Sequence, residues 1–158
     1  MSEQFTIIDA KAGGQVFRTA IGLSALLQKP VKIENIRANR PNPGLQPQHL
    51  TTLQTLQQLT NAKVTGNKLH SRLVVFEPQQ SVGSQLLVNI GTAGSSSLLL
   101  QSAFFPSLIA ENRLRIIGGT NVPFAPPIEF LQHVLLPVLK EMGCRFDLVL
   151  NAHGFYPK

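Results

Sequence analysis

The sequence predicts an α+β fold built from two similar units in tandem. Short apolar strands alternate with helix-length amphipathic segments along the 158 residues. The same order of segments occurs twice, and equivalent landmarks such as Phe5 and Leu86, or Gly14 and Gly94, lie roughly 80 residues apart. A repeat of this size indicates a structural duplication rather than a short solenoid repeat. We therefore expect tandem β-α-β-α-β-β units, each with its helices on one face of a small mixed sheet.

The first unit, residues 1–80, reads as two strand–helix pairs followed by two strands. An apolar strand at residues 5–9 leads into a Gly-Gly turn, and apolar residues then recur at helical spacing over residues 16–27. Pro30 ends this helix because it has no N–H to continue the hydrogen-bond pattern. The remaining expected elements are a half-buried strand at residues 31–36, a helix from residue 50 to near residue 61, and strands at residues 63–64 and 73–76.

The second unit, residues 81–158, repeats this pattern as β-α-β-α-β. A Pro-rich turn at residues 123–127 leads into a long helix that ends near Gly143, and Pro137 is expected to kink it. Helices on one face of a sheet need cover, so we expect the two units to pack helix to helix. The other expected elements are a strand at residues 86–90, a helix at residues 98–109, a strand at residues 113–117 and a closing strand at residues 146–150.

The chain is basic, with a net charge of +6 and a pI of about 10.0. This balance favours anionic partners, although an inert basic surface is equally compatible with composition alone. The basic residues are scattered, so there is no polybasic tail. The lone Cys144 excludes an internal disulfide and indicates a packing thiol. With no signal peptide at the N-terminus and no apolar run of spanning length, we expect a cytoplasmic protein that makes no contact with a membrane.

Two arginines in a stiff loop are the strongest local indication of a binding site. Arg37 and Arg40 follow the strand at residues 31–36 and precede a turn that contains two prolines and a glycine. A guanidinium group presents a planar fork of donors that matches phosphate or carboxylate oxygens. Glu34 is the only acidic residue in this stretch, which favours an anion site over ordinary ion pairs in a solvated loop.

Neighbouring residues extend this hypothesis. The Gly13-Gly14 pair between a strand and a helix lets the backbone approach an anion, and Arg18 lies about one turn inside that helix. Steric reasons alone also place glycines in such turns. His49, after Gln48 at the start of the next helix, can hydrogen-bond a ligand or cap its own helix, and the histidine spacing gives no metal signature.

The second unit has its own Gly-rich turn, Gly91-Thr92-Ala93-Gly94, followed by three serines. It lacks the lysine of a P-loop, so it is not a Walker motif. A run of serines is also a good N-cap, which we favour here over anion binding. The other three histidines are isolated, and surface or core roles are expected for them.

Together these motifs resemble the RNA 3′-terminal phosphate cyclase family. The similar stretches run in family order along almost the whole chain, which makes the resemblance specific. They are residues 13–20 (GGQVFRTA), residues 33–50 (with IENIRANRPNPGL and QHL), residues 90–100 (IGTAGSSSLLL), residues 118–130 (GGTNVPFAPPIEF) and residues 153–157 (HGFYP).

The resemblance implies the chemistry of that family. Its members are built from several β-α-β-α-β-β units in one large domain, and they use ATP and a divalent metal ion to convert an RNA 3′-phosphate into a 2′,3′-cyclic phosphate. A histidine attacks ATP and becomes adenylylated, AMP passes to the 3′-phosphate, and the neighbouring 2′-hydroxyl displaces it. By resemblance, the phosphate-handling residues are Arg18, Arg37, Arg40, Gln48 and His49, and the nucleotide-binding residues are Gly14, Gln101, Pro126 and Phe130.

The chain departs from the family pattern in three places. Lys11 stands where the family has a glutamate that is expected to help hold metal, and lysine cannot do this. Pro47 stands where the family has an arginine. The family's nucleophilic histidine lies beyond the HGFYP motif, and none of the four histidines here occupies its place, so we assign no catalytic residue and no metal ligand.

Two hypotheses about function follow. In the first, the chain is the first two units of an RNA 3′-phosphate cyclase, inactive alone and completed by a second chain that carries the missing units. In the second, it is a non-catalytic RNA-binding or RNA-processing assembly protein, which the lysine at position 11 favours. In both, the expected partner is RNA with a 3′-phosphate end, and exposed apolar surface is expected to support docking of a partner or self-association.

Overall fold

The first unit forms a four-stranded mixed sheet in the computed structural model, which describes residues 5–81 and 83–157. β1 runs parallel to β2, whereas β4 runs antiparallel to both β2 and β3, in the spatial order β1-β2-β4-β3. The predicted β-α-β-α-β-β order of this unit is confirmed. Its strands are β1 (Thr6–Asp9), β2 (Val31–Glu34), β3 (Lys63–Thr65) and β4 (Val74–Glu77).

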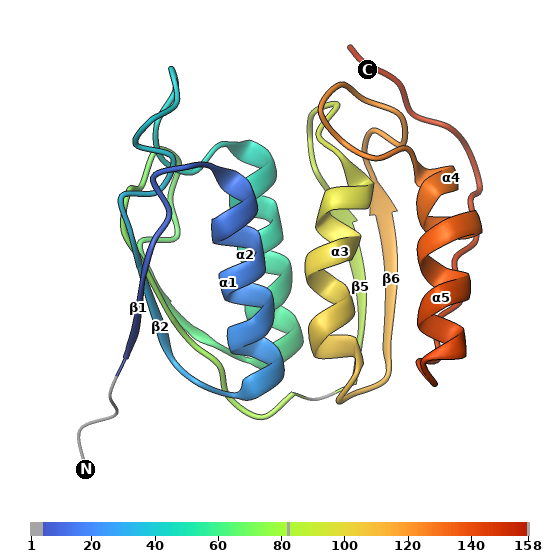
Figure 1. Ribbon diagram of the computed structural model, residues 1–158, viewed down its shortest axis with the longest axis horizontal. Helices are drawn as coiled ribbons and strands as arrows, with labels where there is room; N and C mark the ends of the chain where they lie inside the picture. Colours follow the sequence, from blue (N-terminus) through green and yellow to red (C-terminus); the bar gives the residue numbers. More distant parts are fainter. Residues whose placement is uncertain (1–4, 82, 158) are drawn as a thin grey trace.

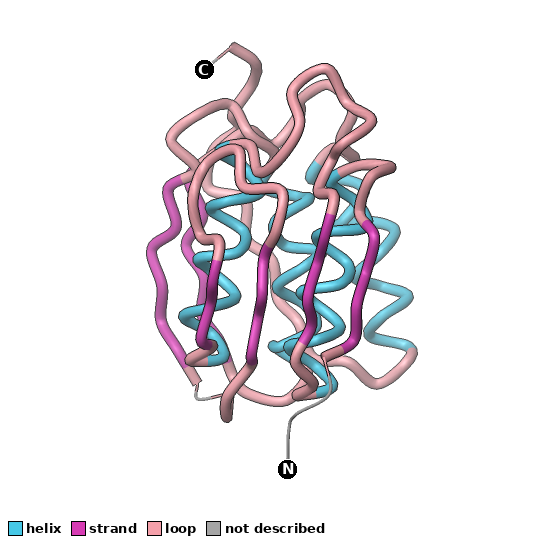
Figure 2. The backbone as a smooth tube through the Cα atoms, turned by 90° about the vertical axis from the view of Figure 1, so that its left-hand side faces the viewer, coloured by secondary structure: helices cyan, strands magenta, loops and turns pink. Residues whose placement is uncertain are grey.

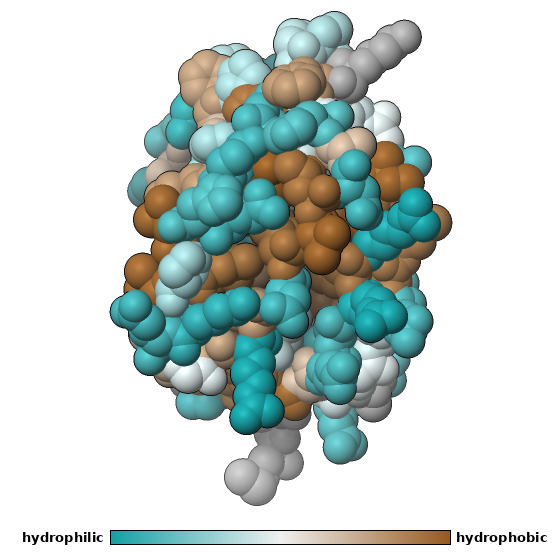
Figure 3. Space-filling view, turned by 90° about the vertical axis from the view of Figure 1, so that its right-hand side faces the viewer, coloured by the Kyte–Doolittle hydropathy of each residue, from teal (hydrophilic) through white to brown (hydrophobic). Residues whose placement is uncertain are grey.

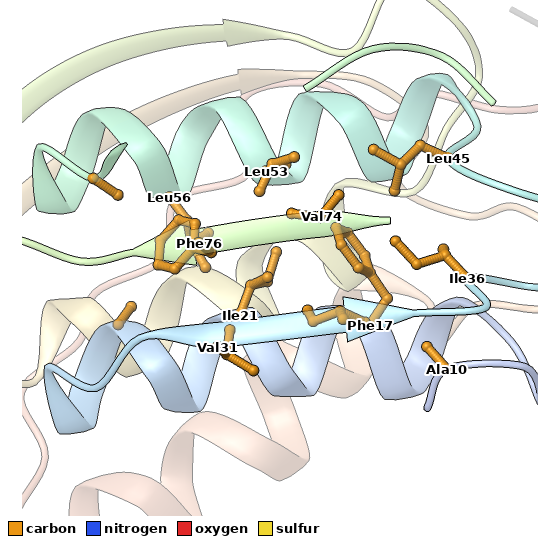
Figure 4. Close-up of a cluster of buried hydrophobic side chains, with 13 residues drawn as sticks. Ala10, Phe17, Ile21, Val31, Ile36, Leu45, Leu53, Leu56, Val74 and Phe76 are labelled. Atoms are coloured by element: carbon orange, nitrogen blue, oxygen red, sulfur yellow. The ribbon is translucent and has the colours of Figure 1, made fainter. Parts of the chain in front are cut away.

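Helices α1 (Gly14–Leu27) and α2 (Pro47–Thr60) cover one face of this sheet (Figure 1). Their apolar faces and the inward residues of β2 and β4 form one continuous core (Figure 4). Phe17, Ile21 and Phe76 are fully buried in it. Because apolar burial is worth about 25 cal/mol per Å², this core is the main source of stability that positions the loops above it.

The second unit has a smaller sheet. β5 (Ser84–Asn89) and β6 (Asn112–Ile117) pair in parallel, and no further strand joins them among the described residues. Helix α3 (Ser96–Ser107) packs against both α1 and α2, as the expected helix-to-helix contact between the units requires (Figure 1). The buried apolar cluster on this side consists of Val88, Ile90 and Leu99.

The predicted long helix is present but not uniform. It begins as α4 (Ile128–Phe130), continues as a π-helical segment (Leu131–Leu135) and ends as α5 (Leu136–Glu141). The wide turn stops just before Pro137, where a kink was expected. Proline donates no N–H to the preceding turn, and a π-helical segment is one way for a helix to accommodate that loss.

The predicted closing strand at residues 146–150 is wrong. These residues follow α5 in a stretch with alternating exposure, but they pair with no strand. An apolar alternation predicts which residues face the protein, whereas a strand also needs a neighbour with free N–H and C=O groups. β6 pairs only with β5 over the described residues, so the alternating pattern is present without the ladder.

The parallel strands all run in one direction along the molecule, and the three long helices all run in the opposite direction. β1, β2, β5 and β6 end at the same end of the molecule, and α1, α2 and α3 begin there (Figures 1 and 2). Every loop that carries a predicted site residue therefore lies at this end, which we call the loop end. Over the described residues, no helix is long and apolar enough to cross a membrane. Residues 1–4, on which the expectation about a signal peptide rests, lie outside that part.

Candidate functional site: an arginine cluster at the start of α1

The N-terminus of α1 has no cap of its own. Gly13 occupies the N-cap position, so no side chain accepts a hydrogen bond from the first turn, and that turn contains no acidic residue. The other two long helices differ: Ser95 Oγ accepts an N–H from Leu98 in α3, and Gln46 forms a capping box with His49 in α2. Uncapped helix N–H groups and the positive end of the helix dipole attract an anion.

His49 packs directly against this helix start. A Cβ atom at Gly14 would collide with His49 Nε2, so only glycine fits at this position. The His49 side chain is 7% exposed, and its ring meets Phe17 edge-on with centroids 6.2 Å apart. Gly14 and His49, both predicted site residues, are thus in contact across α1 and α2.

The tautomer of His49 follows from its hydrogen bond. Nδ1 accepts the backbone N–H of Gln46 at 3.2 Å, so the ring proton resides on Nε2, beside the start of α1. Burial, and then the charges of Arg18 and Arg37, lower the pKa of His49 to about 3. The imidazole is therefore neutral at physiological pH and acts as a hydrogen-bond donor through Nε2.

Arg18 lies one turn into α1 and is almost completely buried. Its Nη2 donates to Gln15 Oε1 at 2.9 Å, and its side chain is 8% exposed. Burial, followed by the nearby charge of Arg37, lowers the pKa of Arg18 to about 10. A buried cation without a counter-ion is unfavourable, so this guanidinium gains more from a bound anion than a surface arginine does.

Arg37 and Arg40 come from the loop after β2. Arg37 adopts a left-handed backbone (φ 56°) and donates from Nη2 to Asn42 O at 3.0 Å, while its buried Nε has no hydrogen-bond partner among the described atoms. Arg40 Nε donates to Ala12 O at 3.1 Å, which lays its guanidinium over Gly13. Burial, and then Arg40, lower the pKa of Arg37, which indicates that the two cations repel each other.

The arginine cluster, defined here as Arg18, Arg37 and Arg40, has no acidic partner. None of the three forms an ion pair with a carboxylate within residues 5–81 and 83–157. Arg37 repels both Arg18 and Arg40, and Arg40 lies over Gly13 at the uncapped start of α1, so a bound anion would be electrostatically favourable there. This arrangement fits the predicted phosphate-handling role of these residues.

The neighbourhood of Lys11 does not fit a divalent metal ion. Lys11 Nζ forms an ion pair with Asp9 Oδ2 at 3.3 Å, and its backbone N–H donates to Asp9 Oδ1 at 3.1 Å. Hydrogen bonds from Lys11 lower the pKa of Asp9. A hard cation requires several oxygen ligands, but one carboxylate already neutralised by lysine supplies few. The described residues include no group of three or more His, Cys, Asp or Glu that could hold a metal ion.

Gln48, at the start of α2, connects the first unit to the second Gly-rich turn. Its Oε1 accepts the backbone N–H of Ser95 at 3.2 Å, and its Cβ lies against Gly94. Two serines of that turn use their hydroxyls within the protein, because Ser95 Oγ bonds Ser97 Oγ at 2.7 Å and Ser97 Oγ donates to Pro126 O at 2.6 Å. This geometry agrees with a structural role for the serine run.

Gln101 lies apart from the loop residues, in a cavity of about 360 Å³ between α1, α3 and α5. Arg18 is the one member of the arginine cluster among the lining residues, so Gln101 and Arg18 face the same cavity. Pro126 and Phe130 are not among the lining residues. Pro126 holds the loop before α4, and Phe130 is 40% exposed. The cavity wall is otherwise mainly apolar, with Phe104, Phe105, Leu108, Leu135, Leu139 and Phe146.

Two positioning residues were not predicted from the sequence. Gln46 fixes the tautomer of His49, and Gln15 holds the Arg18 guanidinium. The spacing of Gln46 and His49 is that of a capping box with unusual residue types, which is a weak signal in a single sequence. The contact between Gln15 and Arg18, three residues apart on α1, could have been expected from helix geometry.

Comparison with known proteins identifies the family of the chain. A family model described as "RNA 3'-terminal phosphate cyclase" matches residues 10–158. Three curated relatives carry that name: those of Drosophila melanogaster (47% identical over 150 residues), Pyrococcus abyssi (46%) and Desulfurococcus amylolyticus (44%). Each match covers 94% of this chain, whereas it covers 42% to 44% of the relative. The chain therefore spans less than half the length of the curated relatives that it matches.

Proposed function

Because the chain belongs to the RNA 3′-terminal phosphate cyclase family, we propose that its arginine cluster binds the phosphate groups on which that family acts. The proposed ligands are the 3′-phosphate of an RNA end and the phosphates of ATP. The observation that carries this proposal is the set of three arginines near the uncapped start of α1, none of which has an acidic partner among the described residues.

The chemistry of the cluster suits a phosphate. Arg40 and Arg37 are oriented by backbone carbonyls, so they need little reorganisation when an anion arrives. The buried Arg18 and the Nε2–H of His49 provide donors from the protein side. Charge-assisted hydrogen bonds of this kind are about twice as strong as neutral ones, and they oppose the repulsion among the cations.

The hydrogen-bond donors of the arginine cluster suit the phosphates of ATP, whereas the residues around Lys11 do not suit a divalent metal ion. Arg18 leads from the cluster into the cavity that Gln101 lines, and we propose that this polar side of the cavity holds part of the nucleotide. When bound, ATP supplies an adenylate group that activates a phosphate. The ion pair of Lys11 with Asp9 gives no support for a metal site here, so we propose none.

We further propose that this pocket does not itself form the covalent adenylate. His49 is the histidine beside the arginine cluster, and its only lone pair lies on Nδ1, which accepts the Gln46 N–H. Its Nε2 carries a proton and abuts Gly14. Such a ring can donate a hydrogen bond to phosphate, but it cannot attack one. The pocket therefore binds and orients, and the adenylylated histidine of the family reaction belongs elsewhere.

A second candidate function is favoured by Lys11. Its ion pair with Asp9 stands where the family pattern has a metal ligand, and it neutralises the carboxylate that such a ligand set would use. A protein that binds RNA 3′-phosphate ends without converting them, in RNA processing or assembly, would have this arrangement. Its lone thiol, Cys144, suits the reducing cytoplasm, where either function is expected.

We also propose a protein partner for the face that carries α5. Figure 3 shows apolar surface gathered at the centre of this face. Val134, Val138, Met142 and Val149 are each at least half exposed. Apolar patches of this kind mark interaction sites, and we propose a second chain or a second copy as the cover. Sizing across a concentration series, with a dye that binds apolar patches, tests this, and a monomer that binds no dye contradicts it.

Oligonucleotide binding tests the phosphate site. RNA with a 3′-phosphate should bind this chain more tightly than the same RNA with a 3′-hydroxyl, by about tenfold for a desolvated charge-assisted contact. Arg37→Ala and Arg40→Ala should remove most of that preference, whereas Arg115→Ala, on an exposed strand position of the second unit, should leave it intact. Equal affinity for both RNA ends in the unchanged protein would remove the phosphate site.

Labelled ATP tests the absence of adenylate transfer. We expect reversible retention of ATP on the chain and no covalent AMP adduct after denaturation, with or without divalent metal. A covalent adduct that persists in a His49→Gln variant would identify another nucleophile. An adduct that disappears in that variant would overturn our assignment of the His49 tautomer.

A further inference from the structure

Phe124 is an exposed aromatic residue in a strained backbone conformation. Its side chain is 104% exposed, and its backbone is left-handed with φ 62°. Bulky residues rarely adopt this region, because the side chain crowds the backbone there. An apolar ring in water adds no burial energy in return. Folding alone does not account for a phenylalanine here.

The loop that carries Phe124 is rigid. Residues 120–127 leave and rejoin the fold at one place, because the Ile128 N–H donates to Thr120 O at 3.0 Å. Pro123 and two further prolines fix most of the remaining backbone. The fully buried Ser97 anchors the far side of the loop through Pro126. The ring is therefore presented to solvent by a stiff support, which lowers the entropic cost of binding to it.

A short series of hydrogen bonds joins this loop to Gln48 at the start of α2, the helix that also carries His49. Gln48 bonds Ser95, Ser95 bonds Ser97, and Ser97 bonds Pro126, two residues after Phe124. Both the arginine cluster and this loop lie at the loop end of the molecule (Figure 1). A polynucleotide whose terminal phosphate occupies the cluster would extend over the neighbouring surface.

We propose that Phe124 is a stacking platform for an unpaired base near the 3′ end of the bound RNA. This inference rests on the proposed phosphate site, and it adds a base-binding subsite to it. Flat aromatic rings beside a basic groove are the usual means of holding single-stranded nucleic acid, because every base has a face to stack. The subsite would be tolerant of sequence and selective for unpaired ends.

A second aromatic ring lies on the same surface. The backbone of Phe155 bridges to that of Asn121 in the Phe124 loop, and its side chain is 55% exposed. Its ring stacks on His153 with centroids 5.7 Å apart and an angle of 23°. The loop end therefore presents a second aromatic face next to the Phe124 loop, as a strand of several nucleotides requires.

Affinity measurements with matched oligonucleotides test the inference. Phe124→Ala should weaken binding of a single-stranded 3′-phosphate RNA about tenfold, and Phe124→Trp should retain it. Phe5→Ala, which removes an exposed ring just before β1 at the opposite end, should have no effect. An abasic site can be placed at each of the last few nucleotides in turn. At the one position whose base stacks on Phe124, the unchanged protein and the Phe124→Ala variant should then bind the RNA with equal affinity.

The tryptophan variant adds a direct readout. The chain contains no tryptophan, so Phe124→Trp creates a single fluorophore whose emission should be quenched when a base stacks on it. Phe124→Gly relieves the backbone strain, so it should fold with an unchanged or higher melting temperature and still lose RNA affinity. This separates a binding role from a structural one.

The results distinguish the subsite from the phosphate site. If the unchanged protein prefers 3′-phosphate RNA, but Phe124→Ala binds every oligonucleotide within about twofold of it and Phe124→Trp emission is unaffected, the stacking platform is wrong and the phosphate site stands. If the preference for a 3′-phosphate is itself absent, the phosphate site fails, and the platform fails with it.

Discussion

The two units share one sequence pattern but differ in how many strands pair and in how much core they enclose. In the first, four strands and two helices enclose a continuous core that includes Phe17 and Phe76. In the second, the sheet has only two strands among the described residues, beside α3 and the interrupted helix of residues 128–141, and residues 146–150 have the alternation of a strand without a partner. The difference shows that the alternating pattern determines which side chains turn inward, whereas the ladder depends on neighbours that the pattern does not contain.

The first helices of the two units have also diverged at their N-termini. The N-terminus of α3 is capped by Ser95, whose hydroxyl accepts the Leu98 N–H and bonds Ser97 Oγ. Ser97 Oγ in turn donates to Pro126 O in the loop before α4. α1 begins with two glycines and leaves its first turn open beside Arg18. One copy of the strand–helix turn therefore holds the loop end together, and the other is available to an anion.

Amide hydrogen exchange should give the largest contrast between the units. The amides of β2 lie between β1 and β4, so they should exchange through global unfolding and be slowed by about a thousandfold or more relative to an unfolded chain. The amides of residues 146–150 donate to no backbone carbonyl among the described residues, so they should exchange almost as in an unfolded chain. Strong protection at residues 146–150 would mean that this segment has found a strand to pair with.

Core truncations should differ between the units. Phe76→Ala removes a fully buried ring and should lower the free energy of unfolding by about 3–5 kcal/mol. Ile116→Ala, on the half-buried inner face of β6, should cost about 1–2 kcal/mol. Urea denaturation measures both. Equal losses would show that the second unit is as tightly packed as the first.

Acid should destabilise the first unit through His49. Its pKa is lowered to about 3 in the folded state, so below pH 6.5 the unfolded chain binds a proton that the folded chain does not. Stability is therefore fully present above pH 6.5, and it falls towards pH 3 by up to about 1.4 kcal/mol per pH unit. Urea midpoints from pH 7 to pH 5 should decline, and the decline should be shallower in His49→Gln. Parallel profiles for the two proteins would show that other groups dominate.

The smallest effect is expected at Lys11. Its ion pair with Asp9 is exposed, so Lys11→Glu should change stability by less than about 1 kcal/mol. The same change places a second carboxylate near Asp9, and Mn²⁺ should then raise the melting temperature of the variant but not of the unchanged protein. Lys11→Gln is the matched control, because it removes the lysine charge without adding a ligand.

Much of the fold could be predicted because its signals are local. The Gly-Gly turn, Pro30 and the apolar periodicity of residues 16–27 indicate where α1 lies, and glycines that have no room for a Cβ, such as Gly14, mark close contacts. The closing strand was wrong because strand pairing is not local. The π-helical segment was foreseen only as a kink, because a proline predicts where a helix is disturbed and not which wider turn results.

The candidate site was predictable in composition but not in geometry. The sequence indicated Arg37 and Arg40 through their stiff loop, but not that Gln46 sets the tautomer of His49. It grouped Gln101 with Pro126, whereas the structure places Gln101 in the cavity with Arg18. Residues far apart in sequence meet through helix packing, which no spacing rule reports.

The shared polarity of strands and helices has a practical consequence. Every loop with a predicted site residue lies at the loop end, whereas β4 ends and β5 begins at the opposite end of the molecule (Figure 1). An affinity tag or a surface tether placed there would leave the arginine cluster and the Phe124 loop facing solution. Immobilised in that orientation, the protein could be used to capture RNA by its 3′ end.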